Sequence, residues 1–283
     1  MKRIVTIQDI SCVGKCSLTV ALPIISAMGV ETAILPTAVL STHTMFQNPA
    51  CADLTDQIEP ISRHWTAEKI TFDAIYTGYL ASGRQISLVC DFFRAFRREG
   101  TPVIVDPAMA DNGKLYPAFP PEFPLEMKKV CALADVILPN ITEAALLTGM
   151  EYRKSYDEAY PRKMLRALAA LGPRYCVLTG VSLKPGRLGI MGYDAAEDRF
   201  FQYDTDHLPA SYHGTGDIFA STVTGAMMRG LSLEHALRIA CDYVAETIRV
   251  TMNNPNSRSY GVDFETTLPW LLRRLGSQTN SPL

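Results

Sequence analysis

No apolar run in this 283-residue sequence is long enough to span a membrane. The most apolar stretch, residues 18–30, is interrupted by Pro23 and Gly29, and Asp9 stands where a secretion signal would need an apolar run. An excess of one charge is also lacking, because 27 Lys and Arg residues face 29 Asp and Glu residues. Without a basic field, the chain has little to hold a nucleic-acid backbone. We therefore expect a soluble, cytoplasmic protein that binds neither nucleic acid nor a membrane.

Paired cysteines are absent as well. The seven cysteines are an odd number without any Cys-x-x-Cys motif, and only Cys12 and Cys16 lie close together. Disulfide frameworks and structural zinc sites usually need closely paired cysteines or Cys/His clusters. We predict reduced thiols and no structural metal.

Two common nucleotide-binding motifs fail at the first turn between a predicted strand and a predicted helix. Gly14 and Lys15 suggest G-x-x-x-x-G-K-[ST], but Asp9 occupies the first glycine position and Cys16 follows the lysine. The turn also lacks the G-x-G-x-x-G pattern of dinucleotide-binding proteins. If the chain binds a nucleotide, the phosphates must lie elsewhere.

Short β-branched runs alternate with helical patterns. Expected strands are residues 3–7, 32–39, 74–77, 103–106, 136–138 and 176–179, and expected helices are residues 17–28, 85–99, 125–134, 142–148 and 156–171. A hairpin at 189–193 and 199–203 and helices at 217–229, 233–252 and 264–275 follow. This order favours an α/β fold with a mostly parallel central sheet, helices on both faces and antiparallel edge strands.

The sequence suggests one domain over residues 1–275 and a disordered tail at 276–283. Residues 111–124 contain four prolines and little periodicity, which is typical of a surface loop. The pattern leaves open whether this loop is an active-site lid or an ordinary connection.

The segment Gly214-Thr215-Gly216-Asp217 comes directly before a helix rich in small residues. Glycines let the backbone turn sharply, and the start of a helix directs free N–H groups and a positive dipole end at one point. The segment therefore predicts an anion hole with a carboxylate at its edge. The pattern alone is also compatible with ordinary helix capping.

Further polar residues follow two predicted strands. Asp106 ends one strand, and Asn140 and Glu143 follow another. Open α/β sheets bind ligands at the carboxyl ends of their strands, so these residues suggest a site for a hard cation and phosphate. Taken singly, Asp106-Pro107 is compatible with a turn, and Thr142 with a helix cap.

Together these motifs resemble the ribokinase-like superfamily, and within it the pyridoxal (vitamin B6) kinases. The matching segments are VTIQD at 5–9, TAVLSTHT at 37–44, TGYL at 77–80 and ADVILPNITEAALLTG at 134–149. The resemblance runs from about residue 3 to residue 251 and is weakest at 111–126. It implies a ribokinase-like three-layer α/β/α sandwich and the use of ATP with Mg²⁺.

The resemblance also implies roles for individual residues. On the phosphate side, the catalytic base is Asp217, the anion hole is formed by Gly214, Thr215 and Gly216, the magnesium ligands, partly through water, are Asp106 and Glu143, and the residues facing the triphosphate are Asn140 and Thr179. On the vitamin side, the implied residues are Asp9, His43, Thr44 and Tyr79. The sequence leaves open whether Tyr79 is instead a core aromatic and His43 a loop histidine. By the same resemblance we expect a homodimer, and whether K⁺ assists stays open.

We therefore expect ATP-dependent phosphorylation of the 5'-hydroxymethyl group of pyridoxamine, pyridoxal or pyridoxine. Asp9 stands where these kinases usually carry serine, which suggests a preference for the amine of pyridoxamine. The related hydroxymethylpyrimidine kinases commonly have cysteine in place of the aspartate at 217, although some relatives act on both substrates. A non-catalytic B6-binding protein would not need Asp217, and a sugar or nucleoside kinase should show an N-terminal Gly-Gly pair; both functions stay open.

Overall fold

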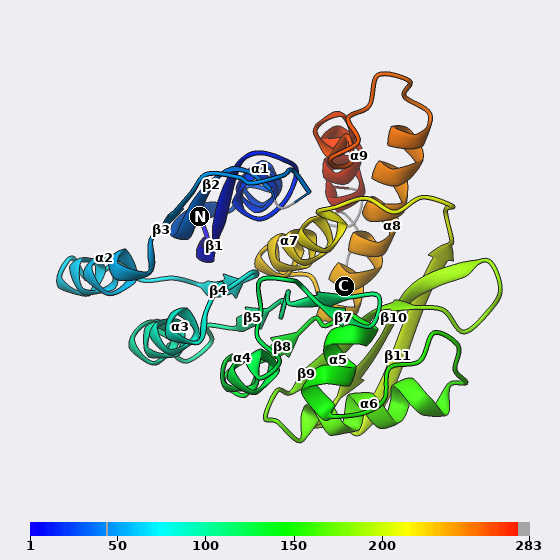
Figure 1. Ribbon diagram of the computed structural model, residues 1–283, viewed down its shortest axis with the longest axis horizontal. Helices are drawn as coiled ribbons and strands as arrows, with labels where there is room; N and C mark the ends of the chain where they lie inside the picture. The colour runs from blue at the N-terminus through cyan, green and yellow to red at the C-terminus, as the bar shows by residue number, and fades with distance from the viewer. Residues whose placement is uncertain (44, 277–283) are drawn as a thin grey trace.

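A nine-stranded sheet forms the centre of the protein in the computed structural model, which describes residues 1–43 and 45–276 (Figure 1). Its strand order is β11-β10-β9-β8-β5-β4-β1-β2-β3. The strands are β1 (Arg3–Val13), β2 (Glu31–Thr42), β3 (Cys51–Asp53), β4 (Ala74–Thr77), β5 (Val103–Val105), β8 (Val136–Ile137), β9 (Tyr175–Val181), β10 (Arg187–Asp194) and β11 (Arg199–Asp206). The pairs from β2 to β9 are parallel, while β3, β10 and β11 pair antiparallel with their neighbours.

Helices cover both faces of the sheet. One face carries α1 (Leu18–Ala27), α7 (Thr215–Met228), α8 (Leu233–Met252) and α9 (Phe264–Gly276). The other face carries α2 (Thr55–Ala67), α3 (Gly83–Phe96), α4 (Phe123–Cys131), α5 (Ile141–Thr148) and α6 (Ala159–Ala169). Successive strand residues point to opposite faces, so Ile4 belongs to the core under α1 and Val5 to the core under α3. The predicted three-layer arrangement is confirmed.

The chain reverses its direction of travel across the sheet at β1. From β1 it passes through α1 to β2 on one side, and then returns to β4 on the other side and continues to β5, β8 and β9. Loops leaving β1 and β4 therefore diverge at their carboxyl ends. Ligands of open α/β sheets bind at such a reversal.

Most predicted elements are present with shifted ends, and β4 and α8 have the predicted bounds. The first strand is the main correction. The local pattern ends this strand before Asp9, but β1 continues to Val13 because it stays paired with β2 as far as Thr42, with a register shift between Gln8 and Ile10. Asp9 therefore lies inside β1, at the irregularity, rather than at its end.

Four elements were not predicted. These are α2, β3 and the two strands of a small hairpin, β6 (Ala110–Asp111) and β7 (Lys114–Leu115). The hairpin and the start of α4 lie at the two ends of the segment 111–124, and residues 116–122 between them form a loop, as the sequence predicts for this segment. The predicted tail lies outside the described residues except for Gly276, which ends α9 instead. The single-domain assignment stays a prediction.

Among the described residues, none of the helices is long and apolar enough to cross a membrane.

Candidate active site

The predicted site residues gather at the carboxyl ends of the parallel strands. Thr77 of β4 pairs with Ile7 of β1 and with Val105 of β5, so the segments that follow these residues leave the same edge of the sheet. Those segments carry Asp9, Tyr79 and Asp106, and Asn140 follows β8 at the same edge. Residues that are far apart in the chain therefore come together because of the parallel pairing.

The Gly-Thr-Gly-Asp segment forms the start of α7. Gly214 is the residue before the helix and has φ 80°, and a Cβ at this position would overlap the carbonyl oxygen of Lys15. Only glycine combines this backbone conformation with so close an approach. No side chain caps this end of α7, so its first N–H groups remain available to an anion. A Cβ built on Gly216 would lie 3.9 Å from Oδ2 of Asp106, which places the carboxylate beside this helix end.

Asp217 lies in the first turn of α7 between two other carboxylates. Its side chain keeps partial solvent contact, but burial among protein groups raises its pKa to about 7. The backbone N–H of Ser17 opposes this by hydrogen bonding to the carboxylate, while the charge of Asp9 raises the pKa further. On the other side, the charge of Asp217 contributes to the raised pKa of Asp106. A carboxylate with a pKa near neutrality, held between two polar groups, is suited to accept a proton.

Asp106 and Glu143 form a second acidic pair, and both are almost fully buried. Burial raises the pKa of Asp106 well above its usual range, and the charges of Glu143 and Asp217 raise it further. Burial also raises the pKa of Glu143 to about 8, although backbone N–H groups of Asn140, Met109 and Ala110 favour its charged form. Such crowding of acidic groups destabilises their ionised forms unless a cation neutralises them.

Glu143 also builds the start of α5. Its Oε2 accepts from the backbone N–H of Asn140 at 2.8 Å, and its own N–H donates to Oδ1 of Asn140 at 2.9 Å. Oε1 accepts from the N–H of Met109 at 3.1 Å, and Nδ2 of Asn140 donates to the carbonyl of Ala110 at 2.8 Å. The carboxylate and the amide therefore already hold the loop after β5 in place. Thr179 of β9 pairs with Asn140 at the same strand end.

The residues present fit a magnesium ion in part. Asp106 and Glu143 supply the hard oxygen atoms that Mg²⁺ prefers, and no hydrogen bond from a described residue occupies the carboxylate of Asp106. No group of three or more His, Cys, Asp or Glu residues that could hold a metal occurs within residues 1–43 and 45–276. A cation here must therefore complete its shell with phosphate oxygens and water, as Mg²⁺ commonly does.

The residues predicted for the acceptor side lie on the other side of Asp217. Asp9 is buried and accepts a hydrogen bond from Oγ of Ser11 at 3.1 Å. Tyr79 packs against the core with its ring 5.3 Å from that of Phe119, as expected of a core aromatic. Burial and then the charge of Asp9 raise the pKa of Tyr79 to about 12, which also places its hydroxyl near that carboxylate.

His43 lies in an aromatic group near the same carboxylate. Its ring is buried and lies 5.3 Å from the ring of His213 and 6.3 Å from that of Tyr260. Burial and the neighbouring His213 lower the pKa of His43, while the charge of Asp9 raises it. Its Nε2 is buried, and its nearest polar neighbour is the backbone of Tyr260, which also raises the pKa of His43. Thr44, the fourth predicted residue, lies outside the described residues.

Sequence reasoning missed three residues of this region. Ser17 lies beside two of the carboxylates, because its backbone N–H lowers the pKa of Asp217 and its hydroxyl lowers the pKa of Asp9. Tyr260 reaches the site from the segment between α8 and α9. His213 had a signal, because it comes directly before the Gly-Thr-Gly-Asp segment, whereas nothing in the sequence pattern indicated Ser17 or Tyr260.

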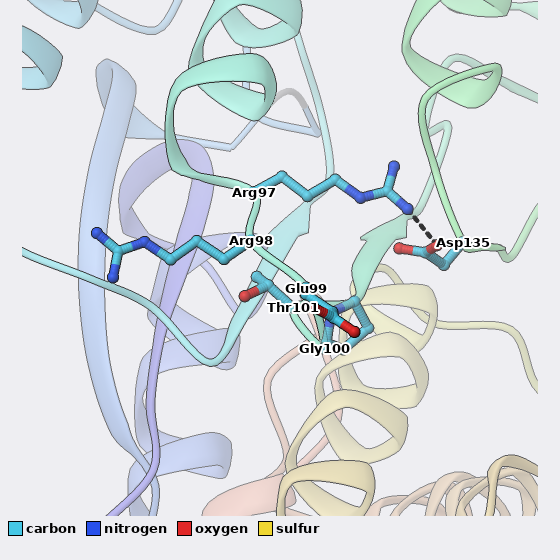
Figure 2. A pocket seen from close by; sticks show the side chains of 7 residues that line it. Arg97, Arg98, Glu99, Gly100, Thr101 and Asp135 are labelled. Atoms are coloured by element: carbon cyan, nitrogen blue, oxygen red, sulfur yellow. Dashed lines mark hydrogen bonds and ion pairs between the residues drawn. The ribbon is translucent and has the colours of Figure 1, made fainter.

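A hollow of about 460 Å³ lies at the opposite edge of the sheet (Figure 2). Thr101 and Pro102, which precede β5, and Asp135, which precedes β8, line it. Nη2 of Arg97 already pairs with Asp135 at 2.5 Å, and the figure shows Arg98 pointing away from that pair. Its lining combines the acidic Glu99 and Asp135 with Arg97 and Arg98, and α3 ends beside it instead of beginning there, so it differs from the region around Asp217.

Known kinases resemble this chain in sequence and in fold. Residues 22–262 match the phosphomethylpyrimidine kinase family. A Bacteroides thetaiotaomicron protein named as a phosphomethylpyrimidine kinase, in a crystal form with pyridoxal, has a TM-score of 0.91 and 38% identity over 95% of each chain. Pyridoxal kinase from Lactobacillus plantarum has a TM-score of 0.89 and 31% identity, covering 98% of this chain and 99% of that chain.

A third relative is named for pyrimidine substrates alone. The hydroxymethylpyrimidine/phosphomethylpyrimidine kinase of Mycobacterium tuberculosis is 26% identical over 266 residues, which are 92% of this chain and 92% of the relative. All three relatives are therefore named as kinases, and their names differ in the acceptor.

Proposed function

This chain belongs to the phosphomethylpyrimidine kinase family of ribokinase-like kinases, and we propose that it transfers the γ-phosphoryl group of ATP to the 5'-hydroxymethyl group of a vitamin B6 vitamer. The proposed acceptors are pyridoxamine, pyridoxal and pyridoxine, and the product is the 5'-phosphate. The observation that carries the proposal is the position of Asp217. It lies at an uncapped helix start, with Asp106 on one side and Asp9 on the other.

In the proposed reaction, Asp217 accepts the proton of the 5'-hydroxyl group. The hydroxyl oxygen bonds to the γ-phosphorus while the bond from that phosphorus to the β–γ bridging oxygen breaks, and ADP leaves. The transition state of such transfers is loose, so positioning and charge neutralisation supply most of the acceleration. A carboxylate whose pKa lies near 7 is adequate for this role, because the proton moves late.

The free N–H groups from Gly214 to Gly216 would hold the γ-phosphoryl oxygens. Mg²⁺, when bound, would neutralise phosphate charge, with Asp106 as a direct ligand and Glu143 acting through water. This division follows from the hydrogen bonds of Glu143, because both of its oxygens already accept from backbone N–H groups. Glu143 thus orients the loop after β5 that carries Met109 and Ala110.

The vitamin would bind beside Asp9, His43 and Tyr79. An aromatic surface formed by His43, Phe46 and Tyr260 is suited to a flat heteroaromatic ring, since the three rings lie 5.4 to 6.3 Å from one another. The pyridoxal-containing crystal form of the Bacteroides thetaiotaomicron protein supports a B6 acceptor over other alcohols.

Hydroxymethylpyrimidine is the second candidate acceptor. The family match and the Mycobacterium tuberculosis relative favour it. The aspartate at 217 speaks against it as the main substrate, because hydroxymethylpyrimidine kinases resembling this chain commonly carry cysteine there. The acceptor is a heteroaromatic hydroxymethyl compound in both cases.

One assay distinguishes these substrates. ADP release is measured with ATP, Mg²⁺ and each of pyridoxal, pyridoxamine, pyridoxine, hydroxymethylpyrimidine and ribose, and mass spectrometry identifies the phosphorylated product. We expect the B6 vitamers to have the highest kcat/KM, and the Asp217→Asn protein to be the control for contaminating kinases. Turnover of hydroxymethylpyrimidine alone would reassign the substrate. No transfer to any of these acceptors would refute the proposal.

A further inference from the structure

Lys15 is the lysine of the incomplete G-x-x-x-x-G-K-[ST] motif described above. In the folded protein its ammonium group contacts two carboxylates. Its Nζ donates to Oδ1 of Asp263 at 2.9 Å and to Oε2 of Glu265 at 3.0 Å. The side chains of Lys15 and Asp263 are only 13% and 10% exposed, whereas that of Glu265 is 53% exposed. The bond between Lys15 and Asp263 is therefore the sheltered one. It joins the loop between β1 and α1 to the start of α9, which Figure 1 shows on the same face as α1.

Asp263 is itself firmly held. Its backbone N–H donates to Oγ1 of Thr251 at 2.8 Å, and Nδ2 of Asn254 donates to its Oδ2 at 2.7 Å. The residues on either side, Val262 and Phe264, are buried in the core. Burial opposes the low pKa of Asp263, but Lys15 and Asn254 keep its pKa below the usual range, so the pair is ionised. Lys15 is thus paired with a carboxylate directly before α9, and Thr251 and Asn254 at the end of α8 hold that residue in place.

The other end of Lys15 lies against the proposed anion hole. Its carbonyl oxygen occupies the space of a Cβ at Gly214, and its side-chain stem lies against Gly261, where a Cβ would be 2.5 Å from Cβ of Lys15. One residue therefore contacts both the start of α7 and the segment before α9. A shift of Lys15 would release the loop from Gly214.

Two positions later, Ser17 has a strained backbone. Its φ and ψ are 50° and −134°, which a residue other than glycine rarely adopts. Its backbone N–H lowers the pKa of Asp217 and its hydroxyl lowers the pKa of Asp9, which places Ser17 beside both carboxylates. Such strain persists only where surrounding contacts hold it, and it often accompanies function. The hydroxyl of Thr19 accounts for one such contact, because it donates to the carbonyl of Cys16 at 2.7 Å.

We propose that Lys15 is a positioning residue for phosphoryl transfer, which through its ion pair with Asp263 holds the 14–17 loop against Gly214 and keeps Ser17 on Asp217. The proposal rests on the function proposed above. Lys15 itself touches neither substrate nor the transferred group in this arrangement. Its effect on the rate is through the placement of the base and of the anion hole.

The test compares four variants with the wild-type enzyme. Lys15→Met keeps the aliphatic part of the side chain and removes the ammonium group. Asp263→Asn removes the negative charge of the partner in the same ion pair. Glu265→Gln removes the exposed partner only. Arg174→Met is the matched control, because it breaks another ion pair with a buried aspartate, Asp194, whose pair lies at the opposite end of the sheet.

Lys15→Met and Asp263→Asn should each lower kcat about ten- to a hundredfold, because small displacements of reacting groups cost factors of this size. The KM values for ATP and for the acceptor should change less than about threefold. Glu265→Gln and Arg174→Met should keep kcat near the wild-type value, even where Arg174→Met lowers Tm. A Lys15→Met protein that loses Tm but keeps kcat within about twofold of Arg174→Met overturns the proposal.

A second comparison separates positioning from general destabilisation. Because Lys15 places the base as well as the anion hole, Lys15→Met introduced into Asp217→Asn should lower the residual rate by a smaller factor than it lowers the rate of the wild-type enzyme, since residues acting as a unit are not additive. An equal loss in both backgrounds would contradict the mechanism.

Hydrogen exchange gives a readout that needs no substrate. The amides of residues 14–17 should exchange faster in Lys15→Met and Asp263→Asn than in wild-type protein and in Arg174→Met. If the wild-type protein transfers phosphate to no acceptor while the exchange differs as expected, the proposed function fails and the loop contact stands. Unchanged exchange at 14–17 overturns the positioning role whatever the substrate.

Discussion

The carboxylate of Glu143 raises the pKa of Asp106, next to which it lies buried. The pKa of Glu143 itself is raised to about 8 from 4.5. A carboxyl group whose pKa is raised in the folded state binds more protons there than in the unfolded state. Its contribution to stability is therefore complete below the unfolded pKa and is lost as the pH rises through the folded pKa.

We predict that the unliganded protein loses thermal stability between about pH 5 and pH 8, because Glu143 and Asp217 then become charged without compensation. Calorimetry across this range measures the change in Tm. Glu143→Gln should weaken the pH dependence while retaining the cap of α5, since glutamine also serves at this position. A Tm that is constant or rises from pH 5 to pH 8 would contradict the raised pKa values.

The magnesium requirement should depend on Glu143. In Glu143→Gln the acidic pair loses one charge, so we expect the Mg²⁺ midpoint of the reaction to rise at saturating ATP, with little change in B6 binding. The measurement is a titration of MgCl₂ followed by ADP release. An unchanged midpoint would show that Glu143 has only a structural role, through its hydrogen bonds with Asn140 and Met109.

Asp217→Asn should lower kcat by about 10²–10⁴, which is the usual worth of a positioned base. Asparagine keeps the size of the side chain and can still accept from the N–H of Ser17, so the fold and ATP binding should persist. Steady-state kinetics and ATP titration calorimetry measure the two effects. A variant with more than half the wild-type kcat, where chemistry limits the rate, would exclude Asp217 as the base.

Gly214→Ala adds only one methyl group, but it should disrupt the site strongly. The new Cβ would overlap the carbonyl of Lys15, and φ of 80° is itself unfavourable for alanine. We expect a large loss of kcat/KM together with a lower Tm. Gly230→Ala is the control, because it has φ 90° and meets no atom within 4 Å, so its loss should be limited to Tm. Equal kcat/KM in both variants would show that the contact at 214 is not needed.

Asp9→Ser tests the choice of vitamer. An ionised Asp9 can pair with the amine of pyridoxamine, which pyridoxal lacks, and such hydrogen bonds contribute roughly 1.5–3 kcal/mol. We predict that kcat/KM for pyridoxamine falls about tenfold or more relative to pyridoxal, with little change in KM for ATP.

The hydrogen bonds from Ser11 and Ser17 to Asp9 favour a different outcome if Asp9 mainly orders the loop. In that case both vitamers should lose equally and Tm should fall. The ratio of the two kcat/KM values therefore decides between recognition of the amine and a structural role.

Elements with a clear periodic pattern could be predicted from the sequence, and those formed by tertiary contacts could not. The helix α8 has a regular apolar stripe and was predicted to the residue, whereas α2 contains Pro60 and buries only Thr55 and Ile58. The strand β3 is exposed along its length and exists through its pairing with β2. β1 extends past Asp9 because β2 continues beside it, which no local pattern indicates.

The same distinction holds for the candidate site. Gly214, Asp217, Asn140 and Glu143 stand in short motifs, so motif reasoning found them as site residues, although it considered Thr142 as the helix cap and the cap is Asn140. The contacts of Ser17 with Asp217 and of Lys15 with Asp263 depend on loops that only the finished fold brings together. The strained φ of Ser17 likewise follows from its surroundings and not from its residue type.

The ion pair of Lys15 with Asp263 joins positions 248 residues apart in the chain. During synthesis, the base and its supporting loop therefore cannot reach their final arrangement until the segment leading into α9 has left the ribosome. Contacts of such long sequence separation also form late, because closing the intervening loop costs entropy before they can stabilise it. A nascent chain that already holds most of the sheet would thus still lack the contact that holds the 14–17 loop, and it would gain this contact only once Asp263 has emerged and folded.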